Sequence, residues 1–304
     1  MKEQLRKMNK LLMVGCLLCL ALLTQRTNAQ TVYLAEDFDS TFVGTPAAPP
    51  GWSQTRIQSV ISAAGEFDWV RNGWTGTAWT SPGVGAIPAT GPVNGNGALW
   101  INDYDFGTTS IAQTERRIES PSFDLTTSTS PYVRFWYFNA EGTGVALNLR
   151  VVISSNGGAT WQTLSNVLNG FDSVANTWNR ISIAIPAKYR TSNVKVGFAI
   201  VNRYGSNNPF IDALTVEEFT PTTITSAANG NWNSSATWVG GVIPTSSHNV
   251  VIAHTVTVGL GTGIIARCQD LTINAGAALN YSTTTTNNLH AYGNVFVSGT
   301  LNAF

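Results

Sequence analysis

The amino-acid sequence predicts an all-β protein: a jelly-roll β-sandwich followed by a β-solenoid. Three observations lead to this fold class. Helical periodicity is nearly absent after residue 30, and short segments of alternating apolar and polar residues recur between residues 131 and 216. Toward the C-terminal end, apolar positions repeat at a fixed spacing, which is typical of stacked coils.

The N-terminal residues have the pattern of a signal peptide. A basic segment precedes an apolar run from Leu11 to Leu23, which is shorter than the about 20 residues that a membrane-spanning helix needs. Thr27 and Ala29 then place small residues before a cleavage site at Gln30. We therefore expect residues 1–29 to be a signal peptide and the mature chain to be secreted or held at the cell surface, without a transmembrane segment. A lipoprotein modified at Cys16 is the alternative.

The alternating segments of the first half predict short antiparallel strands. Each is bounded by Gly, Pro, Asn or Ser, as in a β-sandwich. We expect this sandwich to occupy residues 30–220, with a linker at residues 221–223. The segments are Tyr132–Phe138, Leu147–Ile153, Arg180–Ile185, Val194–Ile200 and Phe210–Val216.

A repeat begins after the linker. Leu271 and Val295 are 24 residues apart, and so are Ile273 and Val297. A period in the twenties is what one coil of a β-solenoid requires, because each coil stacks its apolar positions on those of the previous coil. We therefore expect residues 221–304 to form a solenoid segment, truncated from a longer protein because an uncapped solenoid end exposes strand edges.

Charge and cysteine content narrow the classes of partner. Charged residues make up 11% of the chain and the formal net charge is zero, whereas binding to nucleic acid or to an anionic membrane needs a basic face. Cys268 is the only cysteine after the signal peptide. The fold must therefore hold without an intramolecular disulfide, and Cys268 is expected to be a buried small apolar residue.

Scattered motifs of the first half resemble those of the MAM domain and of the cleaved-adhesin modules of gingipain-type surface proteins. The resemblance implies a jelly-roll sandwich that adheres to proteins or glycans. This chain lacks the cysteines of vertebrate MAM domains. The matching segments are Glu36–Asp39, Gly51–Trp52, Phe67–Trp69, Gly97–Trp100, Glu119–Leu125, Phe135–Tyr137 and Ile211–Asp212.

The second half resembles the start of a G-eight domain, a β-rich extracellular domain. His248 and Asn249 stand where that pattern usually has an acidic residue, so the resemblance supports no catalytic or metal-binding role there. The matching segments are Asn231–Asn233, Ala236–Trp238, Gly240–Pro244, Val250–Ile252 and Thr255–Val258.

The resemblance to jelly-roll sandwiches also implies a metal site. In such domains an acid on the first strand and an acid on the last strand often share a calcium ion, and Glu36, Asp39 and Asp212 fit this pattern. Ca²⁺ prefers several carboxylate and carbonyl oxygens. These three residues are therefore candidate ligands of a structural calcium ion. The alternative is that they are solvated charges at a sheet edge.

Tryptophans supply the candidate ligand contacts. Trp74 and Trp79 are flanked by turn formers and are expected to be exposed on loops, where indole rings can stack on a ligand. Trp69 and Trp100 are expected in the core. The segment Ser154–Trp161 resembles the Asp-box of sialidases, with Asn156 in the acidic position. We interpret that segment as a hairpin turn covered by Trp161.

The sequence contains no recognisable catalytic motif, so no catalytic residue is assigned. We expect a non-catalytic binding or adhesion protein that recognises a glycan or an extracellular protein. The alternative is a carbohydrate-active enzyme whose catalytic β-helix is mostly missing from this chain.

Overall fold

The computed structural model describes residues 30–304 apart from 57–67, 81–87, 102–114, 140–147, 169–176, 202–207, 260–264, 282–287 and 303–304. The predicted signal peptide, residues 1–29, lies outside the described residues. Within the described ranges, no helix is long and apolar enough to cross a membrane.

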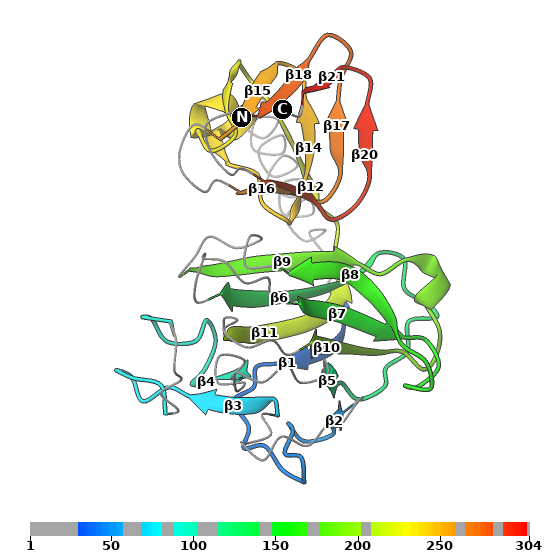
Figure 1. Ribbon diagram of the computed structural model, residues 1–304. Helices are drawn as coiled ribbons and strands as arrows, with labels where there is room; N and C mark the ends of the chain where they lie inside the picture. The colour runs from blue at the N-terminus through cyan, green and yellow to red at the C-terminus, as the bar shows by residue number, and fades with distance from the viewer. Residues whose placement is uncertain are drawn as a thin grey trace, which may run out of the picture. The chain divides into compact units, whose positions relative to one another are not determined.

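Residues 32–218 form two antiparallel sheets (Figure 1). One sheet has the order β3-β4-β11-β6-β9, with β1 also paired to β11, and the other has the order β2-β5-β10-β7-β8. The strands are β1 (Val32–Glu36), β2 (Ser53–Arg56), β3 (Val70–Gly73), β4 (Gly97–Trp100), β5 (Glu115–Glu119), β6 (Pro131–Asn139), β7 (Asn148–Ser154), β8 (Gln162–Leu168), β9 (Trp178–Ala184), β10 (Lys195–Val201) and β11 (Pro209–Glu218). A short 3₁₀ helix, η1 (Ala187–Tyr189), follows β9.

The strand order is that of a jelly roll. Without β2, β3 and β4, the strands in chain order are β1, β5, β6, β7, β8, β9, β10 and β11. The first, eighth, third and sixth of these lie in one sheet, and the second, seventh, fourth and fifth lie in the other. The first and last strands are therefore neighbours, as two nested Greek keys require, and the predicted fold class is confirmed.

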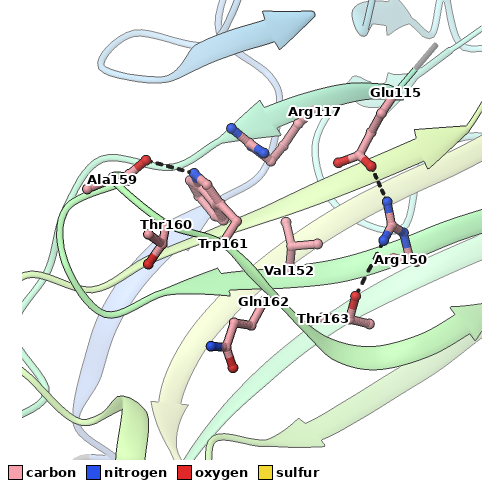
Figure 2. Close-up of a pocket in the computed structure, with 10 residues that line it drawn as sticks. Glu115, Arg117, Arg150, Val152, Ala159, Thr160, Trp161, Gln162 and Thr163 are labelled. Carbon is pink, nitrogen blue, oxygen red and sulfur yellow. Dashed lines mark hydrogen bonds and ion pairs between the residues drawn. The ribbon is translucent and has the colours of Figure 1, made fainter. Parts of the chain in front are cut away.

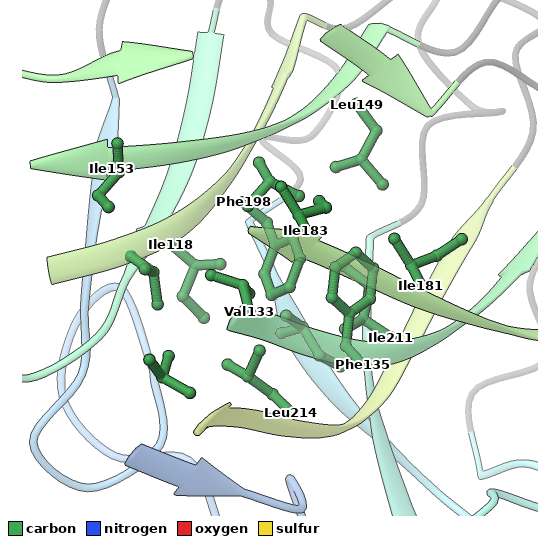
Figure 3. Close-up of a cluster of buried hydrophobic side chains, with 14 of the residues drawn as sticks. Ile118, Val133, Phe135, Leu149, Ile153, Ile181, Ile183, Phe198, Ile211 and Leu214 are labelled. Atoms are coloured by element: carbon green, nitrogen blue, oxygen red, sulfur yellow. The ribbon is translucent and has the colours of Figure 1, made fainter. Parts of the chain in front are cut away.

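The core of the sandwich lies between the two sheets. It is formed by every second side chain of each strand, because alternate side chains point toward the facing sheet. Val133 and Phe135 of β6 point inward and are fully buried, and so are Ile181 of β9 and Phe198 of β10. Figure 3 shows these side chains converging between the strands. The rings of Phe135 and Phe198 meet edge to face, with centroids 5.0 Å apart.

Residues 222–302 form parallel sheets of a β-solenoid. Two four-stranded sheets have the orders β12-β14-β17-β20 and β13-β15-β18-β21, and β16 pairs with β19. The strands are β12 (Thr222–Thr225), β13 (Gly230–Asn231), β14 (His248–Ile252), β15 (Thr255–Val258), β16 (Ile265–Cys268), β17 (Leu271–Ile273), β18 (Ala278–Tyr281), β19 (Asn288–Ala291), β20 (Val295–Val297) and β21 (Thr300–Asn302). Two 3₁₀ turns, η2 (Ser235–Thr237) and η3 (Val239–Gly241), lie between β13 and β14.

The stacking register of the solenoid is the one that the repeat predicts. Leu271 pairs with Val295 and Ile273 pairs with Val297. Leu271 and Ile273 are fully buried, whereas Val295 and Val297 are each 47% exposed because, among the described residues, their coil is stacked on one side only. Cys268 is also fully buried, as expected.

The change from antiparallel to parallel pairing falls between β11 and β12. Among the described strands, each sheet lies wholly on one side of this point. β12 begins at Thr222, inside the expected linker, because Thr222 and Thr223 pair with His248 and Asn249. That residues 30–220 fold as an independent domain stays a prediction.

Candidate ligand-binding site

A hollow lies on the outer face of the five-stranded sheet, lined by residues of β5, β7 and β8. β10 lies between β5 and β7. Its inward residues are large, whereas Gly197 and Ala199 point outward beside their partners on β7, Val152 and Arg150. No side chain larger than a methyl group therefore rises from this part of β10 to fill the space between its neighbours.

The hollow is a pocket of about 460 Å³ whose walls come from three strands and one turn (Figure 2). Charged side chains of β5 and β7 face each other across it, and the turn between β7 and β8 closes one end. The lining residues are Glu115, Arg117, Arg150, Val152, Gly158, Ala159, Thr160, Trp161, Gln162 and Thr163. A volume of this size lies within the range usual for small-ligand sites.

Each charged residue of the pocket takes part in an ion pair. Arg150 forms an ion pair with Glu115 and donates a hydrogen bond to Thr163 Oγ1 at 3.5 Å. Arg117 forms an ion pair with Glu119 at 2.9 Å. The guanidinium of Arg117 also lies over the indole of Trp161, 4.4 Å from its centroid. These pairs hold donors and acceptors in fixed positions around an aromatic ring.

Trp161 is positioned by the Asn156 turn, so the prediction of a hairpin covered by this tryptophan is confirmed. Asn156 Oδ1 accepts a hydrogen bond from the Thr160 amide at 2.9 Å. Gly157 and Gly158 have φ values of 71° and 99°, which favour glycine. The indole Nε1 of Trp161 then donates to Gly158 O at 3.0 Å. The sequence predicts only a structural role for this motif, whereas its tryptophan also lies in the wall of a pocket.

Of the three predicted calcium ligands, Glu36 lines a second pocket, of about 350 Å³, beside β1 and β11, here called the acidic pocket; Asp39 and Asp212 are not part of its lining. The lining also includes Asp37, Asn94 and residues 213–215. Asp212 is fully buried, and burial raises its pKa to about 6 although three amide donors oppose the shift. Burial also raises the pKa of Glu36, and the nearby charges of Asp37 and Asp39 add to that effect.

Backbone amides already use most of the acceptor capacity of Asp212. Its Oδ2 accepts hydrogen bonds from the amides of Val93 and Asn94 at 2.6 and 2.9 Å, and its Oδ1 accepts one from Ala213 at 2.6 Å. This leaves about one of its four lone-pair sites for another partner. Among the described residues, no group of three or more His, Cys, Asp or Glu side chains has the spacing of a metal site.

Trp79 is buried, contrary to the expectation of an exposed loop residue. It is 5% exposed and packs on Phe210 of β11, with ring centroids 5.0 Å apart. The reason is a second apolar cluster on the outer face of the six-stranded sheet, formed by Trp79, Ala98, Trp100, Phe138 and Phe210, with Val70, Trp74 and Trp178 packed against it. Trp74 is half-buried and meets Trp79 edge to face at 5.3 Å. Trp69 and Trp100 are buried, as expected.

Comparisons with known proteins add a likeness in fold. No model of a known protein family matches the sequence, and no curated protein matches it. The K1 cleaved adhesin domain of Lys-gingipain from Porphyromonas gingivalis W83 is similar at 15% identity and a TM-score of 0.38, over 62% of this chain and 100% of that domain. The K2 domain of Lys-gingipain gives 16% identity and a TM-score of 0.39, over 60% and 98%.

A xylan-binding domain from Paenibacillus barcinonensis is also similar, at 10% identity and a TM-score of 0.34 over 62% of this chain and 95% of that domain. At such identities and scores, these likenesses carry no argument about ligand or activity. The resemblances to the MAM and G-eight families stay predictions.

Proposed function

We propose that this protein is an exported, non-catalytic binding protein whose β-sandwich binds a glycan in the pocket around Trp161. The observation that carries the proposal is the placement of one indole ring among fixed, paired charges on the hollow face of a sheet.

The chemistry of the pocket suits a sugar. The flat face of an indole stacks on the apolar C–H face of a pyranose ring, and such aromatic contacts supply much of the binding energy at recognition sites. Neighbouring hydroxyl groups of a sugar both donate and accept hydrogen bonds. The ion pair Arg150–Glu115 offers a donor and an acceptor side by side in the wall of the pocket, and the guanidinium of Arg117 is a further donor beside Trp161.

The ion pairs also argue for a neutral ligand. Each of the two arginines already has a carboxylate partner, so an anionic ligand would have to displace a glutamate or lie beside it. A polyhydroxylated ligand needs neither change. We therefore infer that neutral sugars bind better than uronic acids or sulfated glycans.

A glycan and matrix-protein array with the mature chain, residues 30–304, tests the function. We expect neutral oligosaccharides among the hits and loss of their signal in Trp161→Ala. Trp161→Phe keeps an aromatic ring and should retain part of the signal. Hits confined to proteins, or sugar binding that is unchanged in Trp161→Ala, would contradict the proposal.

Calcium at the acidic pocket is a separate proposal. Glu36 and Asp39 would supply most of the carboxylate oxygens, because Asp212 is largely satisfied by amides. An ion there would offset the repulsion between Glu36, Asp37 and Asp39 that contributes to the raised pKa of Glu36. Its role would be structural.

A further inference from the structure

The segment Pro88–Asn96, here called the strap, links Asp39 and Asp212 to the tryptophan cluster on the outer face of the six-stranded sheet. It precedes β4 and carries no ionisable side chain. The strap is bonded to Asp39 and Asp212 on one side and to the tryptophans Trp74, Trp79 and Trp178 on the other.

One side of the strap is held by the two aspartates. Asp212 Oδ2 accepts hydrogen bonds from the amides of Val93 and Asn94. Asp39 Oδ1 accepts one from the amide of Asn96 at 2.6 Å. Because hydrogen bonds to a charged acceptor are about twice as strong as neutral ones, three such bonds form a firm anchor.

The other side of the strap contacts the tryptophans through its backbone carbonyls. Pro88 O accepts the indole Nε1–H of Trp79 at 2.9 Å, and Gly91 O accepts that of Trp178 at 3.1 Å. Asn96 O accepts the backbone amide of Trp74 at 2.8 Å. The strap thus fixes the orientation of two indole rings and the base of a third.

The fit against Trp74 is close enough to need glycine. A Cβ atom on Gly91 would lie 2.7 Å from Nε1 of Trp74, a distance that real Cβ atoms essentially never show. A Cβ atom on Gly95 would overlap the carboxylate of Asp39. Glycines therefore stand where the strap passes Trp74 and where it passes Asp39.

We propose that Asp39 and Asp212 are positioning residues: they hold the strap across the tryptophan cluster and so set the surface that Trp74 and Trp178 present. This role differs from metal ligation, because it needs only the carboxylates and the amides of the strap. The proposed glycan pocket lies on the other sheet, so this positioning role does not rest on the proposed function.

Hydrogen exchange of the indole N–H groups, followed by NMR, tests the positioning without a ligand. In Asp212→Asn, the indole protons of Trp79 and Trp178 should exchange at least about tenfold faster than in the wild type, because buried hydrogen bonds to a charged acceptor are lost. The indole of Trp161, which bonds to Gly158 O on the other sheet, is the internal reference and should not change.

Gly95→Ala is the second variant. It keeps every carboxylate but displaces the strap from Asp39, so it should give the same selective acceleration. Asp124→Ala, at an exposed aspartate that accepts hydrogen bonds from Thr126, is the control and should give none. Exchange at Trp79 and Trp178 that is unchanged in both strap variants would overturn the proposal. An equal rise at Trp161 would also overturn it, because it would indicate general destabilisation.

A binding arm separates this inference from the proposed function. If the wild-type chain binds no glycan, the proposed function fails while the exchange result still decides the positioning role. If it binds in the pocket around Trp161, Asp212→Asn and Trp74→Ala should both retain the affinity, because these residues belong to the other sheet.

Discussion

Two register partners in the solenoid give a matched test of coil stacking. Ile273 and Val297 occupy the same position in successive coils, but Ile273 is fully buried and Val297 is 47% exposed. Ile273→Ala removes three buried carbon atoms, each worth about 0.8 kcal/mol, and leaves a cavity. We expect a loss of about 2–4 kcal/mol in the free energy of unfolding of the solenoid. Val297→Ala should cost less than about 1 kcal/mol, because half of its surface is already in water.

Urea unfolding, followed through the indole resonance of Trp238, measures both losses. Trp238 is buried in the same apolar cluster as Ile273 and meets Trp232 edge to face at 5.0 Å. A local probe is needed because the chain has a sandwich and a solenoid that need not unfold together. Equal losses in the free energy of unfolding for the two variants would refute the claim that coil stacking buries Ile273 and leaves Val297 half exposed.

Three further predictions concern the ion, the domain boundary and acid stability. Chelator should lower the melting temperature of the protein by several degrees and added calcium should restore it, because an ion at a hundredfold excess over its Kd stabilises the folded state by about 2.7 kcal/mol. Glu36→Ala should remove this response and Asp124→Ala should keep it. A melting temperature of the wild-type protein that does not change with EDTA would exclude the ion. Residues 30–220 expressed alone should give the dispersed NMR spectrum of a folded domain, and an unfolded spectrum would contradict the boundary. Burial raises the pKa of Glu218, but hydrogen bonds from Tyr33, Ser130 and Thr129 outweigh this and lower it overall. The ionised Glu218 therefore contributes stability above the pKa it has in the unfolded chain, and this contribution is lost as the pH falls through its pKa in the folded protein. Glu218→Gln should lower the melting temperature at pH 7 and lower it much less at pH 3. An equal loss of melting temperature at the two pH values would contradict this pH dependence.

The alternating strands were predictable because burial on one face leaves a period of two. The segments predicted from Tyr132 and from Val194 correspond closely to β6 and β10. The spacing of Leu271 and Val295 predicted a register that the structure shows. β5 was not recognised as a strand because its inward position 116 carries an arginine, which breaks the alternation of apolar and polar residues.

The candidate site was less predictable because it depends on neighbours that are distant in sequence. Glu115 and Arg150 meet only because β10 pairs with both β5 and β7. Outward Gly197 and Ala199 were a signal in the sequence, since two small residues on a central strand leave a hollow. The turn formers that flank Trp79 predict an exposed ring, but they do not show that Phe210, on the outer face of β11, is available for Trp79 to pack against.

The central claim is that a glycan binds in the pocket around Trp161, and an NMR titration tests it most directly. A neutral oligosaccharide selected on the array would be added to the labelled chain of residues 30–304 while the indole resonances of the protein are recorded. We predict that the indole resonance of Trp161 shifts with saturation, together with the side-chain Nε–H resonances of Arg117 and Arg150, while that of Trp238 stays in place. A bound glycan that leaves Trp161 unshifted would contradict the account.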